Sequence, residues 1–94
     1  MISFLTYHAV PDVNHSDYGQ INGAYINCWI EASDLEKAKM ISRKTIEDLK
    51  WAILSLEDAY PISLSDFAPG SEGKEFHEQA LIDKEVYQIH TYTE

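Results

Sequence analysis

Several things are scarce in this chain of 94 residues. It has a single cysteine, Cys28, and only three prolines and four glycines. One cysteine cannot form an internal disulfide, and it rules out a zinc site built from cysteines. The sequence also lacks a run of about 18 apolar residues, so we expect no membrane-spanning helix. Residues 1–8 have neither the basic start nor the cleavage site of a signal peptide. We therefore expect a cytoplasmic protein that makes no contact with a membrane.

Basic residues are also few. Seven Lys and Arg stand against 16 Asp and Glu, which gives a formal net charge of −9. Such a surface repels phosphate backbones, so we expect no nucleic-acid partner. A basic protein would be a compatible partner, because opposite charges steer association. The apolar fraction of 45%, with 12% aromatic residues, indicates a globular chain, and its length predicts one domain over residues 1–94.

The stretch from Gly23 to Ile41 is the most regular part of the chain. Its first half alternates between a small aliphatic set and a larger set: Ala24, Ile26, Cys28, Ile30 and Ala32 against Tyr25, Asn27, Trp29 and Glu31. A period of two predicts a strand. Ser33 and Glu36 then form a capping box, after which apolar residues recur at helical spacing as far as Leu49. The pattern predicts a strand that leads directly into a helix.

The other segments complete a strand–strand–helix–strand–helix–strand order. Residues 1–10 alternate as a first strand that Pro11 ends, and residues 11–22 form a polar connection. Residues 59–70 are predicted to be loop, residues 71–82 a second helix with Ser71 as N-cap, and residues 86–93 a last strand. We expect an α+β domain in two layers, with a four-stranded sheet and both helices on one face.

Residues 51–57 are ambiguous. As a strand they would place two sets on opposite faces: Ala52, Leu54 and Leu56 against Trp51, Ile53 and Ser55. Some of the same apolar residues also continue the spacing of the preceding helix, and neither glycine nor proline separates the two segments. A single helix from Asp34 to about Tyr60 would exceed the usual 8–20 residues. We favour a third strand, and the continued helix stays open as the alternative.

Four stretches of the chain form a recognisable pattern. They are the first strand, Gly23-Ala-Tyr-Ile-Asn-Cys-Trp-Ile30 with its helix, Trp51 with Leu56-Glu-Asp-Ala-Tyr60, and Gln79-Ala-Leu81 before the last strand. This pattern resembles a family of small uncharacterised bacterial proteins. The resemblance implies an α+β domain related to ferredoxin-like folds, and it supports the third strand. It brings no established activity and so assigns no functional residue. In many of the similar proteins a glycine precedes the tryptophan, where this chain has Lys50.

No motif indicates a catalytic or metal centre. Asp12-x-Asn14-x-Ser16 copies the start of an EF-hand loop, but the glycine and glutamate that should follow at its sixth and twelfth positions are missing. Cys28 lies in the aliphatic set, so we expect it to be buried and unreactive. No metal-binding spacing links the four histidines, which are His8, His15, His77 and His90. We assign no catalytic residue, no metal and no cofactor.

The sheet face opposite the predicted helices is the most informative feature. If the helices cover the aliphatic face, the other face carries the candidate binding or interface residues Tyr25, Trp29, Trp51, Ile53, His8, His90 and Tyr92. A large apolar patch usually marks an interface or a ligand groove. Three interpretations stay open: a back-to-back homodimer, a binding face for another protein, and a ligand or catalytic cleft between subunits.

We favour a small acidic protein that acts by binding, as a homodimer, with an inhibitor or immunity-type role toward a basic protein as one form. The alternative is a small dimeric ferredoxin-like enzyme, or a ligand-binding protein, that uses an aromatic and histidine pocket. The alternation also predicts that Trp29→Glu breaks self-association while the domain stays folded.

Overall fold

The computed structural model describes residues 1–62 and 72–93, and its α+β architecture confirms the predicted order of elements. The elements are β1 (Ile2–Pro11), β2 (Gly23–Glu31), α1 (Leu35–Asp48), β3 (Trp51–Ile62), α2 (Glu72–Asp83) and β4 (Glu85–Tyr92). Residues 51–57 are a strand, not a continued helix. That strand reaches Ile62 and so includes the start of the predicted loop. The rest of that loop and the predicted cap at Ser71 lie outside the described residues.

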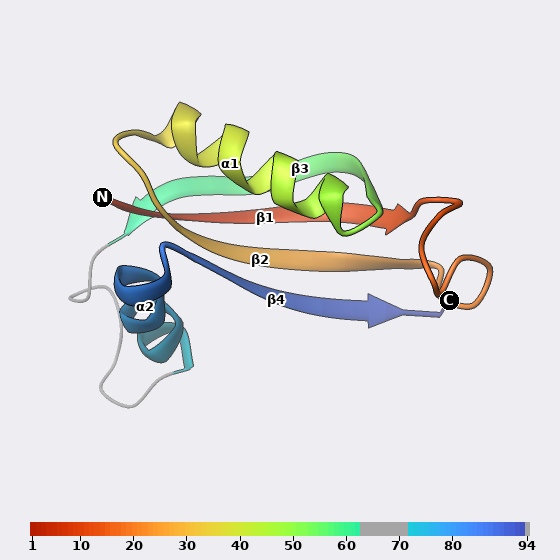
Figure 1. Cartoon of the computed structure of the whole chain (residues 1–94). Helices are drawn as coiled ribbons and strands as arrows, with labels where there is room; N and C mark the ends of the chain where they lie inside the picture. The colour runs from red at the N-terminus through yellow and green to blue at the C-terminus, as the bar shows by residue number, and fades with distance from the viewer. Residues whose placement is uncertain (63–71, 94) are drawn as a thin grey trace.

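The four strands form one antiparallel sheet in the order β3-β1-β2-β4 (Figure 1). Strands β1 and β2 pair as an antiparallel hairpin across the polar connection, and β4 pairs along β2 without a register shift. The two interior strands carry no Asp, Glu, Lys or Arg from Ile2 to Pro11 and from Gly23 to Ile30, as expected of strands with neighbours on both sides. The order of elements differs from the β-α-β-β-α-β order of ferredoxin-like folds, so that relation stays a prediction.

The two helices lie on opposite faces of the sheet (Figure 1). Ala38 of α1 belongs to a core that includes Cys28, whereas Ala80 of α2 packs with Trp29. Neighbouring residues of a strand point to opposite faces, so these two cores are on different sides. The prediction that both helices share one face is therefore wrong. The physical reason is that large apolar side chains on the second face, Trp29 and Phe4 among them, also need a cover.

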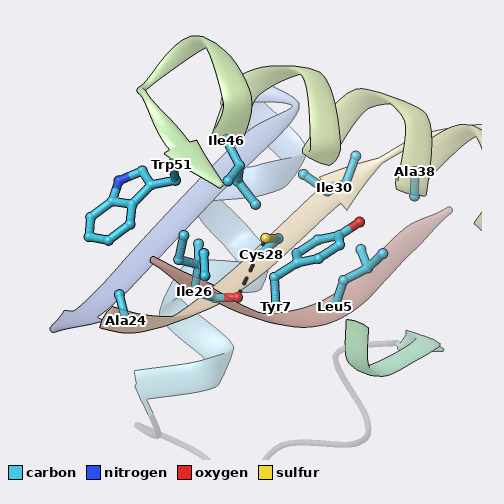
Figure 2. Packing of buried hydrophobic residues seen from close by; sticks show 10 residues of the cluster. Leu5, Tyr7, Ala24, Ile26, Cys28, Ile30, Ala38, Ile46 and Trp51 are labelled. Atoms are coloured by element: carbon cyan, nitrogen blue, oxygen red, sulfur yellow. Dashed lines mark hydrogen bonds between the residues drawn. The ribbon is translucent and has the colours of Figure 1, made fainter. Parts of the chain in front are cut away.

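The core beneath α1 is built from small and aliphatic side chains together with Tyr7 and Trp51, and Figure 2 shows it between the helix and the sheet. Cys28 is fully buried there, as its place in the aliphatic set predicts. One polar pair is also buried: the hydroxyls of Tyr7 and Ser42 are hydrogen-bonded at 2.7 Å, and Ser42 also donates to the carbonyl of Ala38. Burial raises the pKa of Tyr7. The sequence pattern missed Ser42, because a serine does not mark an apolar helix face.

The ends of α1 differ in detail from the predicted ones. Asp34, not Ser33, is the N-cap, and its carboxylate accepts a hydrogen bond from the backbone N–H of Lys37 at 2.8 Å. At the other end Lys50 has φ +71°, which is the left-handed conformation that glycine often supplies after a helix. Lys84 has φ +74° at the corresponding place between α2 and β4. Each helix is therefore followed by a lysine in the left-handed conformation, and β3 begins directly after Lys50.

Two irregularities in β3 decide which of its side chains face α1. The register with β1 shifts twice, so that Leu54 and Glu57 have no partner opposite them. Leu56 packs against the core beneath α1, and the extra residue at 54 brings Trp51 and Ile53 onto the same face. The prediction that Trp51 and Ile53 lie on the other face is wrong, because a bulge changes the phase of the alternation.

Candidate functional site

Helix α2 covers only one end of its sheet face. In the part of the chain that the structure describes, the rest of that face is open. It carries four aromatic and histidine side chains, which we call the open-face cluster: His8, Tyr25, His90 and Tyr92. His8 comes from β1, Tyr25 from β2, and His90 lies opposite Tyr25 on β4. Tyr25 is 43% exposed, and His90 is exposed as well. The cluster is therefore a surface feature of three adjacent strands.

His8 has a defined position within this cluster. Its Nε2 atom lies 2.5 Å from the hydroxyl oxygen of Tyr92. Its ring stacks on that of Tyr25, with 4.6 Å between the centroids and 13° between the planes. Hydrogen bonding and stacking thus hold the imidazole from two directions. A histidine fixed in this way can recognise a partner by hydrogen bonding or take part in proton transfer.

Gly23 makes the contact between His8 and Tyr92 possible. Strands β1 and β4 are not neighbours, because β2 lies between them. The ring of Tyr92 occupies the space beside Gly23, where an added β-carbon would meet the phenol oxygen and the ring carbons. Only glycine leaves this room. The glycine at the start of β2 is the sequence signal for this arrangement.

A row of polar side chains crosses the same face next to the cluster. The Thr6 hydroxyl donates to Oδ1 of Asn27 at 2.9 Å, and Nδ2 of Asn27 donates to Oε1 of Gln88 at 3.3 Å. All three side chains are half-buried. This row lies between the open-face cluster and the part of the sheet that α2 covers. It was not predicted, although strand alternation alone would have placed these residues on one face.

Three of the seven predicted residues do not belong to the open-face cluster. Trp29 is only 4% exposed, because it packs against Phe76 of α2, at 4.6 Å between ring centroids, and against Phe4 at 5.0 Å. Trp51 is buried beneath α1, and Ile53 packs against the same core. The structure therefore brings together His8, Tyr25, His90 and Tyr92 of the predicted set. The open surface that remains is smaller and more polar than the sequence suggested.

The charges are divided between helices and strands. All seven basic residues lie on a helix or directly after one: Lys37, Lys39, Arg43, Lys44, Lys50, Lys74 and Lys84. Every charged side chain on the strands is acidic: Glu31, Glu57, Asp58 and Glu85. The loop of residues 12–22 carries only acidic charges as well. Close to the cluster, Ser55 lies opposite His8 and donates to Oε2 of Glu57 at 2.8 Å. Glu31 lies 3.5 Å from the N-terminal ammonium of Met1, and Glu85 accepts a hydrogen bond from Thr45 of α1. The strands therefore present their negative charge mainly at Glu57 and Asp58 of β3.

Neither the thiol nor the buried phenols offer a reactive group. Burial raises the pKa of Cys28, and the nearby carboxylate of Glu85 raises it further. Burial likewise raises the pKa of Tyr87, whose hydroxyl donates to Glu85 at 2.7 Å. These groups stay protonated and shielded from solvent near neutral pH. Over residues 1–62 and 72–93, no group of three or more His, Cys, Asp and Glu could hold a metal ion.

Comparison with known proteins adds no relative. No family model matches this chain, and no curated protein or solved structure matches it. The similarity to a family of small bacterial proteins therefore stays a prediction. Among the described residues, no helix has the length and apolar character needed to cross a membrane.

Proposed function

We propose that this protein acts by binding, as a homodimer, and that the open face takes a basic protein as its partner. The observation that carries the proposal is the division of charge. An exposed aromatic cluster lies on a sheet whose only charged side chains are acidic, while all the basic residues are kept on or directly after the helices. An inhibitor or immunity-type role is the form of binding that fits this surface.

Physical chemistry supports the basic partner in two ways. A net charge of −9 favours encounters with an electropositive surface, and the absence of cations from the strands directs such encounters to the sheet. Exposed tyrosine and histidine side chains then supply contact area and hydrogen bonds. Tyrosine is enriched at interfaces because it combines a large apolar ring with a polar end. Arginine and lysine of a partner can also stack on the exposed Tyr25 ring.

Panning a random peptide display library against the protein would test this proposal. We expect the selected peptides to be rich in Arg and Lys, and their binding to weaken with salt. Tyr25→Ala should reduce that binding by about tenfold, the scale of one interface tyrosine. Tyr18→Ala is the matched control, because Tyr18 is also exposed, at 56%, but lies in the loop before β2. Peptides without basic residues, or equal losses in both variants, would contradict the proposal.

A second candidate function uses the same cluster as a site for a small ligand or for catalysis. The hydrogen bond between His8 and Tyr92 favours it, because a phenol paired with an imidazole is suited to proton transfer. Screening a fragment library by NMR would test it through the ring signals of His8. We expect bound fragments to shift those signals, and His8→Gln but not His15→Gln to abolish binding. A library without a single fragment that shifts the His8 signals would rule out this candidate.

The remaining expectations belong to the same proposal. A cytoplasmic location, a bacterial origin and a relation to ferredoxin-like folds follow from the sequence and from the resemblance described above. Expression with the termini fused to fluorescent reporters would test the location directly.

A further inference from the structure

Strand β4 is an edge strand with the composition of an interior strand. From Val86 to Tyr92 it has no charged residue, no proline and no glycine. Its pairing with β2 runs from Gly23 opposite Tyr92 to Ile30 opposite Glu85 without a shift, so it has no bulge. The interior strands are likewise uncharged, β1 throughout and β2 from Gly23 to Ile30. An edge strand in a chain with 24% charged residues would be expected to carry some charge.

The other edge of the sheet is protected in the usual ways. Strand β3 contains Glu57 and Asp58, it has Pro61 near its end, and its register with β1 shifts twice. Charges, proline and bulges all discourage a further strand from pairing with an edge. The two edge strands of the sheet therefore differ in how well they resist pairing with a further strand. From Val86 to Tyr92, nothing in the composition of β4 discourages a further strand.

The backbone of β4 has hydrogen-bonding groups directed away from β2. The N–H of Glu31 donates to the carbonyl of Lys84 at 2.8 Å, in line with the register of the β2–β4 pair. Antiparallel partners alternate between hydrogen-bonded and non-hydrogen-bonded pairs. The backbone N–H and C=O groups of Lys84 and of every second residue after it therefore point to β2. Those of Tyr87, Ile89 and Thr91 point outward, and Ile89 is 39% exposed.

We propose that β4 pairs with β4 of a second copy of this chain, antiparallel and centred on Ile89. This inference rests on the homodimer of the proposed function and names its interface. A second copy fits because an antiparallel strand of this composition complements itself. Tyr87 would lie opposite Thr91, and Val86 opposite Tyr92, which are aromatic and β-branched combinations that stabilise strand pairs. The uncharged edge also lets two chains of net charge −9 approach without placing carboxylates opposite each other.

The pairing would join the two sheets into one of eight strands. The twofold axis of such a pair stands perpendicular to the sheet, so equivalent faces lie on the same side. Both α1 helices would then cover one face of the joint sheet. Both open-face clusters would lie side by side on the other face and stay accessible. The edge pairing is therefore compatible with a binding role for the open face, whereas a back-to-back dimer would bury that face.

Solution mass measured over a wide range of protein concentrations tests the edge pairing. We expect the wild-type chain to dimerise. Ile89→Lys should raise the dissociation constant by more than about tenfold, because two lysines would face each other at the axis. Leu54→Lys is the matched control: Leu54 is 58% exposed on the opposite edge, and its replacement should leave the dimer unchanged. Circular dichroism must show that both variants are folded.

A second measurement does not depend on any variant. In the dimer the amides of Tyr87, Ile89 and Thr91 should exchange more slowly with deuterium as the protein concentration rises. A dimer that survives Ile89→Lys but dissociates on Tyr25→Ala would overturn the edge pairing and leave the homodimer in place. A wild-type chain that is monomeric at all concentrations would overturn both the edge pairing and the homodimer.

Discussion

The phenol of Tyr92 lies in the space that a β-carbon on Gly23 would occupy. The absence of a side chain at one end of β2 thus lets a ring from β4 reach His8 on β1. One glycine therefore determines whether Tyr92 can reach His8.

We expect Gly23→Ala to displace the Tyr92 ring and break its hydrogen bond with His8. The free energy of unfolding should fall by about 1–3 kcal/mol, the usual cost of overpacking, as measured by chemical denaturation. In a Tyr92→Ala background the same change should be neutral or stabilising, because alanine loses less conformational entropy than glycine. An equal cost in both backgrounds would show that Tyr92 is not the neighbour that matters.

Trp29→Glu should unfold the α2 side of the domain, contrary to what the strand alternation suggests. The side chain is buried against Phe76, and truncation of a buried tryptophan alone costs about 3–5 kcal/mol, to which a buried charge adds. Tyr25→Glu is the control on the same strand and face, and it should stay folded because Tyr25 is exposed. Thermal unfolding, monitored by circular dichroism, would distinguish the two variants. A folded Trp29→Glu protein would disprove the packing of α2 on this face.

Replacing the two left-handed lysines by glycine should stabilise the protein. The left-handed conformation costs an L-residue about 1–2 kcal/mol. Lys50→Gly and Lys84→Gly should therefore each raise the free energy of unfolding by about 1 kcal/mol. Lys44→Gly, inside α1, is the control, and it should lower the free energy of unfolding by about 1 kcal/mol. Urea denaturation of the three variants provides the comparison. Losses at all three positions would mean that the left-handed conformation carries no cost here.

Cys28 should react with thiol reagents only after unfolding, and it should make stability fall at alkaline pH. The pKa of the Cys28 thiol is raised in the folded state, whereas a cysteine in the unfolded chain has a pKa of about 8.5. Above that pH the unfolded chain releases the proton and the folded chain keeps it, so stability declines by up to about 1.4 kcal/mol per pH unit. Cys28→Ala should flatten the decline between about pH 8 and 9, below the pKa of about 10 at which tyrosines titrate. Rapid labelling of the native protein would contradict its burial.

Much of the fold could be predicted where one local signal decides the outcome. The alternation from Ala24 to Ile30 and the cap signal beside Asp34 correctly predict a strand followed by a helix. The cap itself is one residue later than predicted, because Ser33 and Asp34 are both good caps and only the folded chain selects between them. Burial of Cys28 followed from its aliphatic neighbours.

What could not be predicted depends on contacts between distant segments. Alternation shows that Trp29 and Cys28 face opposite ways, but it does not show that a helix 50 residues later covers Trp29. One extra residue in β3, at Leu54, changed the face of Trp51 and Ile53 relative to Leu56, and no sequence signal marks such a bulge when glycine is absent. The His8–Tyr92 pair in turn required the strand order, which places β2 alone between them.

The sheet order also has a consequence for the growing chain during translation. Strand β2 is central in the finished sheet, but its neighbour β4 is made only after β1, α1, β3 and α2. Until β4 is in place, the uncharged edge of β2 from Gly23 to Ile30 is open to other chains. A chain that stops after β3 would keep that edge permanently, so such a fragment should aggregate even though its three strands and α1 are complete.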